Sequence, residues 1–350
     1  MQKNILIIFF SILLLIVFSF FFQNQAKGQG FSLPNLNISL PPSDQISSPD
    51  EVKNFALDLK PKYPGPNQEV NVSAKSYSFD IDRAVITWSI NGIQKLKGVG
   101  EKNFTFRTGD VGSKTTINII VVSLDGLKLE NNLIIIPADV DILWEAENYI
   151  PPTYKGKALP TSISKIKISA LPNVVIDDVK FSPSKLIYNW EINGKKKIDI
   201  SGYGKNSFSF KSSAMIGQDN IKLTMTDYNK KILVEKRVLI NIVQPKIIFY
   251  EKNPLAGIKY NLALSDKIDL GGGEMSIKAE PYFFSLSDLD QLFYQWNMNN
   301  KDINMENDPA ILNLRTPEGG SGYSFINLRV KNPLSILQFA DKSLTINFGR

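Results

Sequence analysis

WSING at Trp88–Gly92 is a short sequence motif that occurs three times, about a hundred residues apart. Its other copies are WEING at Trp190–Gly194 and WNMNN at Trp296–Asn300. A tryptophan after alternating apolar residues is typical of a buried strand. The Asn-Gly pair behind it predicts a type I′ hairpin turn, whose two central residues need positive φ. The Asn-Asn pair of the third copy suits this turn less well. The chain is therefore predicted to be an array of three like units, each built around a tryptophan-bearing strand and a tight hairpin.

Further segments of alternating apolar and polar residues recur at matching places around each tryptophan. The expected strands before it are Val70–Ala74, Ile166–Ala170 and Met275–Ala279, and those after it are Ile117–Val122, Ile221–Met225, Phe325–Val330, Leu127–Ile136, Ile232–Ile242 and Leu337–Phe348. Each strand has the period-two pattern of a sheet with one buried face. About seven short strands per hundred residues, with a tryptophan on a central strand, indicate an immunoglobulin-like β-sandwich. The predicted fold class is all-β, with three tandem Ig-like sandwiches.

Composition limits the chemistry that the chain can perform. The 350 residues are 43% hydrophobic, 11% aromatic and 21% charged, which is the composition of a folded protein. The sequence has neither cysteine nor histidine, which excludes disulfides, cysteine nucleophiles, Ser-His-Asp triads and imidazole or thiolate metal ligands. We therefore expect a protein that is not an enzyme and has no cofactor, with no catalytic, cofactor-binding or metal-ligating residue predicted.

The N-terminal segment is strongly apolar. Residues 5–22 are interrupted only by two serines, and eighteen residues in a helix cover about 27 Å, close to the thickness of a bilayer core. Residues 1–23 are predicted to be a membrane anchor, with cleavage after Ala26 left open as the alternative. Lys3 favours a cytoplasmic N-terminus and an extracytoplasmic bulk, although Lys27 weakens the charge asymmetry. The proline-containing residues 24–50 are expected to be a linker.

The remaining chain divides at the repeat period. The predicted Ig-like domains are residues 51–137, 138–244 and 245–350. A single proline and a few polar residues separate the last strand of one unit from the first strand of the next, at residues 137–139 and 244–245. Such short connections predict stiffly coupled domains and a rod of roughly 100 Å.

The repeated phrase carries a resemblance. Together with the polar turn at Asp80 and Asp82, it is similar to the strand-C region of bacterial Ig-like and polycystic-kidney-disease-type (PKD) domains. The resemblance covers residues 51–350 and implies the fold; the fuller Gly-Asp-Gly signature of PKD domains is absent, so no single family follows. The chain also resembles multi-domain, membrane-anchored surface proteins of bacteria with reduced genomes, which implies no established activity.

The paired acidic turn is the sharpest candidate for a binding site. Its equivalents are Asp80 and Asp82, Ser182 and Ser184, and Asp288 and Asp290. Paired carboxylates can supply some of the six to eight oxygens that calcium needs. Serine shares with aspartate the ability to cap a helical turn, so capping explains all three copies and is the preferred interpretation. Calcium binding at one or two copies remains open.

Aromatic residues near the joints are a second candidate. Trp144, Tyr149 and Tyr154 are expected at the first joint, and Tyr250 and its neighbours Phe249 and Tyr260 at the second. They fit either a wedge between sandwiches or a platform for sugar rings, and buried rings would exclude the platform.

Charged residues give weaker signals. Glu145, Glu147 and Glu251 could serve acid-base chemistry but are interpreted as polar strand ends. Arg107, Lys211 and Arg315 recur at equivalent positions and are expected to point outward, where they could bind acidic wall polymer. Lys195–Lys197 is expected on an exposed sheet edge, where lysines oppose strand pairing. At a net charge of +6 without a basic stripe, no nucleic-acid partner is expected.

These patterns predict a non-enzymatic, membrane-anchored extracytoplasmic rod of Ig-like domains that serves as an interaction or structural module of the cell envelope. It could be accessory to a pilus or secretion machine. The alternative is a glycan-binding adhesin or lectin-like surface protein. The expected partners are the bilayer, through residues 5–22, and envelope proteins or cell-wall glycan. The sequence does not identify the bound partner or the oligomeric state.

Overall fold

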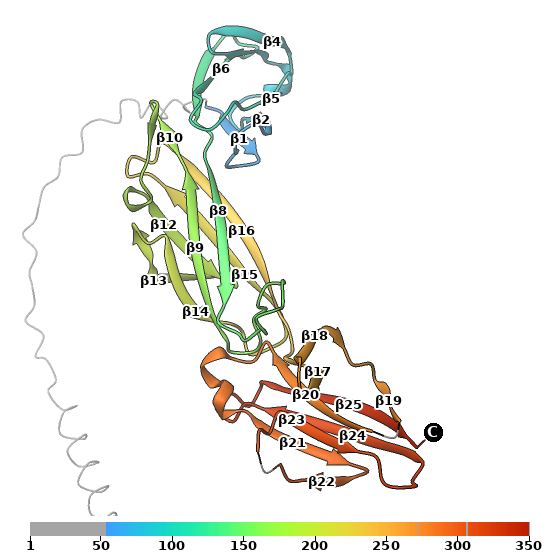
Figure 1. Cartoon of the computed structure of the whole chain (residues 1–350). Coiled ribbons are helices and arrows are strands. Elements are labelled where there is room, and N and C mark those ends of the chain that lie inside the picture. Colours follow the sequence, from blue (N-terminus) through green and yellow to red (C-terminus); the bar gives the residue numbers. More distant parts are fainter. Residues whose placement is uncertain (1–53, 272, 306, 350) are drawn as a thin grey trace, which may run out of the picture. The chain divides into compact units, whose positions relative to one another are not determined.

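The computed structural model describes residues 54–271, 273–305 and 307–349, and these form three successive β-sandwiches (Figure 1). In the first sandwich a three-stranded sheet, β1-β2-β5, packs on a four-stranded sheet, β4-β3-β6-β7. Its strands are β1 Ala56–Lys60, β2 Glu69–Lys75, β3 Val85–Ile90, β4 Ile93–Val99, β5 Asn103–Arg107, β6 Thr115–Val122 and β7 Lys128–Ile135. All pairings within both sheets are antiparallel, as in Ig-like domains.

The second sandwich repeats this topology, with sheets β14-β9-β8 and β13-β12-β15-β16. Its strands are β8 Asp139–Ala146, β9 Lys165–Asn173, β12 Ile187–Ile192, β13 Lys195–Tyr203, β14 Ser207–Lys211, β15 Gly217–Thr226 and β16 Leu233–Ile242, with a small added hairpin of β10 Val175–Ile176 and β11 Val179–Lys180. The prediction of tandem Ig-like sandwiches is confirmed.

The third sandwich is larger than its relatives. Its sheets are β18-β17-β20-β23 and β19-β25-β24-β21-β22. The strands are β17 Lys246–Asn253, β18 Gly257–Ala263, β19 Lys267–Gly271, β20 Glu274–Tyr282, β21 Phe293–Met298, β22 Lys301–Ile303, β23 Ile311–Arg315, β24 Gly322–Lys331 and β25 Phe339–Phe348. Strand β19 crosses to the other sheet and pairs in parallel with β25. Strands β18 and β19 have no counterpart in the first two units, and the repeat alignment did not predict them.

The repeated tryptophans explain why the three units share one fold. Trp88, Trp190 and Trp296 are at most 1% exposed. Each indole Nε1 donates a hydrogen bond to a backbone carbonyl beyond the hairpin, at 2.7 Å to Glu101, 2.9 Å to Lys205 and 2.8 Å to Pro309. Burial of the large ring is thus combined with satisfaction of its polar group, as a core tryptophan requires.

The hairpin prediction also holds in detail. Asn91 and Gly92 have φ of 49° and 80°, and the second pair, Asn193 and Gly194, has 51° and 75°. The third pair, residues 299 and 300, has φ of 47° and 64° although both are asparagines. Asparagine tolerates this left-handed region better than most residues, so the weaker phrase still makes the same turn.

Buried apolar side chains form three main cores, drawn from residues 55–135, 138–240 and 247–346, and residues 53–350 together form one compact unit. The three cores agree in number with the three expected domains, but they do not fix the domain boundaries. The expected domain boundaries therefore stay a prediction. The predicted anchor at 1–23 and linker at 24–50 lie outside the described residues. Within the described part of the chain, no helix is long and apolar enough to cross a membrane.

Candidate functional site

The paired acidic turns differ among the three copies. In the first, Asp80 accepts a hydrogen bond at 3.1 Å from the backbone N–H of Asp82 and caps a 3₁₀ turn, so the capping prediction is confirmed there. In the second, Ser182 stands at the cap position but makes no side-chain cap bond and instead contacts Ser184. In the third, the cap residue is Ser285. Capping by all three copies was therefore wrong, because the polar side chains of the later copies have other partners.

Asp288, the third-copy counterpart of Asp80, fixes a turn of the same sandwich. Its Oδ2 accepts a hydrogen bond at 2.8 Å from Nδ2 of the buried Asn332. Burial acts to raise the pKa of Asp288, but hydrogen bonds from Asn332 and from nearby serines outweigh it and hold that pKa below its usual range. Among the described residues, no group of three or more acidic side chains is arranged to hold a metal ion.

Two of the joint aromatics, Tyr149 and Tyr154, do not lie where the sequence placed them. Tyr149 exchanges backbone hydrogen bonds with residues 283 and 284 of the third sandwich, and the Tyr154 ring packs edge-on against Tyr282 at 5.5 Å. Both were expected at the first joint. The error arises because β8 runs along the second sandwich before Tyr149, and eight residues of strand cover about 26 Å.

A buried polar network holds this second joint. Glu280 is 3% exposed, and its two carboxylate oxygens accept hydrogen bonds from the hydroxyls of Tyr149 at 3.0 Å and Tyr260 at 2.6 Å. Beside it, the hydroxyls of Tyr250 and Tyr282 lie 2.7 Å apart. Burial, followed by the proximity of Glu280, raises the pKa of Tyr149 well above its ordinary value. These side chains stabilise the joint.

This burial decides the sugar-platform hypothesis for the joint rings. Tyr250 is 6% exposed and cannot stack on a sugar. Trp144 is partly buried against the core of the second sandwich, and the Lys157 ammonium lies 3.2 Å from its ring centroid. The wedge interpretation therefore fits the second joint, and the platform at Tyr250 is wrong.

The other charged candidates are exposed or engaged in ion pairs. Glu147 pairs with two lysines, and Glu251 lies 2.7 Å from Lys259. Arg107, Lys211 and Arg315 are exposed, as predicted. Lys195–Lys197 opens the edge strand β13, also as predicted. Neither acid-base chemistry nor wall-polymer binding gains support from these contacts.

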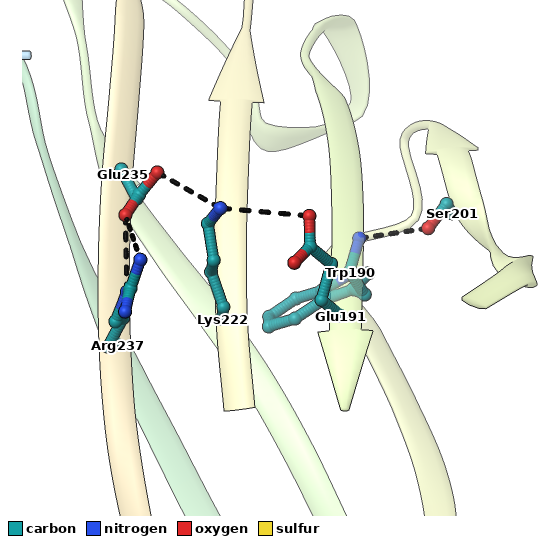
Figure 2. Close-up of polar contacts among 6 residues, drawn as sticks. All are labelled: Trp190, Glu191, Ser201, Lys222, Glu235 and Arg237. Carbon is teal, nitrogen blue, oxygen red and sulfur yellow. Dashed lines mark hydrogen bonds and ion pairs between the residues drawn. The ribbon is translucent and has the colours of Figure 1, made fainter. Parts of the chain in front are cut away.

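On the outer face of the second sandwich, charged side chains form ion pairs with one another (Figure 2). The Lys222 ammonium lies between two carboxylates, 3.7 Å from Glu191 and 3.2 Å from Glu235, and the Arg237 guanidinium lies 2.9 Å from Glu235. Burial acts to raise the pKa of Glu235, but the bonds from Arg237 and Lys222 hold it below its usual range. We call this row the charge ladder.

The outer face of the third sandwich has a different composition. The outward side chains of β21, β24 and β25 include amides in the middle and aromatic rings at both ends, and we call this surface the amide face. Its members are Phe293, Gln295, Asn297, Tyr323, Phe325, Asn327, Arg329, Lys331, Phe339, Asp341, Ser343 and Asn347. Phe293 is 58% exposed, Tyr323 64% and Phe339 43%, so the rings at both ends are open to solvent.

Three hollows lie along the amide face. One of about 580 Å³ is lined by Phe293, Lys331, Ile336 and Phe339, with Pro333 among its other walls. The next, of about 340 Å³, shares Arg329 with the first and is lined by Gln295, Asn297 and Asn327. A third, of about 430 Å³, lies at Tyr323 and Asn347. The first two hollows adjoin and form a depression that passes from apolar to polar walls.

The amide face was not predicted from the sequence, although the sequence contains a signal for it. Phe325 was included in a period-two strand, but it is out of phase with the buried Ile326, Leu328 and Val330. A ring at an outward position of an otherwise alternating strand indicates exposure. The preceding Tyr323, also outward, repeats the signal.

The comparisons with known proteins concern the fold. No family model and no curated protein matches the chain. Similar solved structures include the fibronectin(III)-like modules of Clostridium thermocellum CbhA, at 14% identity over 54% of this chain and 95% of that chain, with a TM-score of 0.26. The central fibronectin-III array of RIM-binding protein shows 14% identity over 85% and 96%, with a TM-score of 0.27. Bacteroides ovatus SGBP-B, solved with a mixed-linkage heptasaccharide, shows 8% identity over 85% and 71%, with a TM-score of 0.22. At such values these structures indicate nothing about a ligand or partner of this chain.

Proposed function

We propose that the protein is a non-enzymatic module of the cell envelope that works by contact between its Ig-like domains and other envelope molecules. The observation that supports this proposal is the amide face, where exposed rings and amide groups stand on a five-stranded sheet. Contact residues on a rigid scaffold are the usual way in which a sandwich domain binds a partner.

The proposal includes the location. Residues 1–23 anchor the chain with its N-terminus in the cytoplasm, and residues 51–350 lie outside the membrane. The bilayer binds residues 5–22, and envelope proteins or cell-wall glycan contact the sandwiches, whereas nucleic acid does not. An anchored chain of this kind suits an accessory component of a pilus or secretion machine.

Cross-linking in cells tests the contact and the location together. A photoreactive phenylalanine analogue replaces Phe339 on the amide face, and the same analogue replaces Tyr77, which is 99% exposed on the first sandwich, as the matched control. We expect position 339 to capture envelope components that position 77 does not, together with an intact peptide of residues 1–22. A mature N-terminus near Lys27, or equal capture at both positions, contradicts the anchored contact module.

A further inference from the structure

The amide face is organised in rows across its strands. Strand register places Phe293, Lys331 and Phe339 side by side at one end. Asn297, Asn327 and Ser343 form a row in the middle, and Tyr323, Asn347 and Asp269 form the row at the other end. Lys331 and Tyr323 are eight residues apart on β24, a distance of about 27 Å along a strand. The surface is therefore long enough for an extended polymer.

The fixed charges of this surface largely cancel within the chain. The Arg329 guanidinium makes two bonds to the Asp341 carboxylate, at 2.5 and 3.1 Å. Asp269 accepts a bond at 2.9 Å from Asn347. Lys331 is the one cation of the end row, and no carboxylate of the described residues lies within ion-pair distance of it. Such a surface lacks the excess positive charge that binds a polyanion.

The order of apolar and polar groups argues against a protein partner. Protein interfaces have an apolar core and a polar rim. Here the exposed rings stand at the two ends, and the row of Asn297, Asn327 and Ser343 lies between them. A protein covering the middle would have to desolvate amides and an ion pair where interfaces concentrate apolar contact.

The same order fits a chain of sugar rings. A hydroxyl both donates and accepts hydrogen bonds, as does a carboxamide. Among the described residues, the exposed Asn327 amide makes only the bond that its oxygen accepts from Ser343 at 2.7 Å, so its Nδ2 group is open to a ligand. Aromatic rings such as Phe293 and Tyr323 cover the apolar faces of a flat ligand.

We infer that the amide face binds an uncharged, linear polysaccharide that lies along strands β21, β24 and β25. This inference rests on the proposed contact function and names the partner of the same surface. The end rings stack on sugar faces, and the central amides bond to hydroxyls.

Affinity electrophoresis and titration calorimetry of the full-length protein in detergent test the inference. The probes are hydroxyethylcellulose, galactomannan and chitohexaose, with heparin as the polyanion. We expect at least one uncharged probe to bind, and Phe293→Ala, Phe339→Ala and Asn327→Ala each to weaken it about tenfold, equivalent to about 1.4 kcal/mol. Tyr77→Ala, the matched change at an exposed ring of the first sandwich, leaves affinity unchanged.

Three results overturn the inference. They are no binding to any uncharged probe at millimolar sugar, binding to heparin alone, and an affinity in all three amide-face variants that equals that of the native protein. The proposed contact function has a separate test: if position 339 cross-links to an envelope protein while the sugars fail to bind, the contact function stands and the polysaccharide inference falls.

Discussion

The outer faces of the second and third sandwiches use equivalent strands but differ in chemistry. Glu191 faces Lys222 across β12 and β15, and Asn297 faces Asn327 across β21 and β24. In each case the first residue directly follows the buried tryptophan. The charge ladder satisfies its own groups within the chain, whereas the amide face leaves hydrogen-bonding groups open. The difference indicates that inward residues specify the fold and that outward residues are free to carry function.

The largest expected effect tests the common basis of this comparison. Trp190→Ala and Trp296→Ala should each destabilise their own sandwich by about 3 to 5 kcal/mol, because each removes a buried ring and the indole bond to a backbone carbonyl. Hydrogen exchange read by mass spectrometry, peptide by peptide, measures the loss in each sandwich. If one replacement lowers the unfolding free energy by less than about 1 kcal/mol, the tryptophan does not stabilise the two sandwiches in the same way.

A transfer of the ladder onto the amide face tests the contrast directly. The double variant Asn297→Glu, Asn327→Lys places the charges of Glu191 and Lys222 at the equivalent positions. We expect the stability of the third sandwich to stay within about 1 kcal/mol, because the new charges pair with each other. The affinity for the uncharged polysaccharide should fall by at least tenfold, or about 1.4 kcal/mol. Unchanged affinity in titration calorimetry would show that the central amides are not part of the site.

Removal of Lys222, the central lysine of the charge ladder, tests how much the ion pairs of this face contribute to the free energy of unfolding. Lys222→Ala leaves the Glu191 and Glu235 carboxylates without their shared cation, and we expect a loss of about 1 kcal/mol that shrinks in high salt. The depressed pKa of Glu235 contributes stability above its unfolded pKa of about 4.3, and this contribution is lost as pH falls through the folded value. Lys222→Ala should therefore flatten the acid limb of the stability curve.

The matched change on the other face is Asn327→Ala. Its side chain is exposed and, among the described residues, bonds only to Ser343, so the unfolding free energy should change by less than about 0.5 kcal/mol. Urea unfolding of both variants measures the pair. If Lys222→Ala and Asn327→Ala destabilise the protein equally, the ion pairs of the charge ladder do not stabilise their sandwich more than the amides of the amide face stabilise theirs.

Much of the fold follows from the sequence because it rests on local rules. Period-two alternation located β6, β15 and β24, and the Asn-Gly phrase set the turns even where Asn-Asn replaced it. Strands β18 and β19 were not predicted, because an insertion in one repeat has no second copy with which to align. The parallel pairing of β19 with β25 depends on long-range contact that no local pattern encodes.

The site was harder to predict for a physical reason. Tyr149 was assigned to the wrong joint, because proximity along the chain does not reveal that a strand carries the chain to the far end of a sandwich. The amide face gathers residues from β21, β24 and β25, and their register was needed to see the rows. The one local signal was the aromatic ring of Phe325 at an outward position of its strand. An alternation pattern that is used only to find buried residues does not reveal this signal.

A further small effect concerns Asp288, which the sequence singled out and which lies in a turn beside the amide face. Its side chain bonds to Asn332, the first residue of the turn 332–338, and Pro333 and Ile336 of this turn line the first hollow. At the other end of the turn, the Gln338 side chain donates a hydrogen bond at 3.1 Å to the Ser162 carbonyl.

Because the pKa of Asp288 is lowered in the folded state, the carboxylate stabilises the turn above its unfolded pKa of about 3.9 and loses this effect as pH falls through the folded value. Asp288→Asn keeps an oxygen acceptor but loses the charge, so we expect a cost of about 0.5 to 1 kcal/mol at neutral pH. Hydrogen exchange of residues 332–338, corrected for the intrinsic rate, should lose protection below about pH 4 in the native protein and stay level in the variant. The same pH dependence in both proteins would assign the acid sensitivity of the turn to a different group.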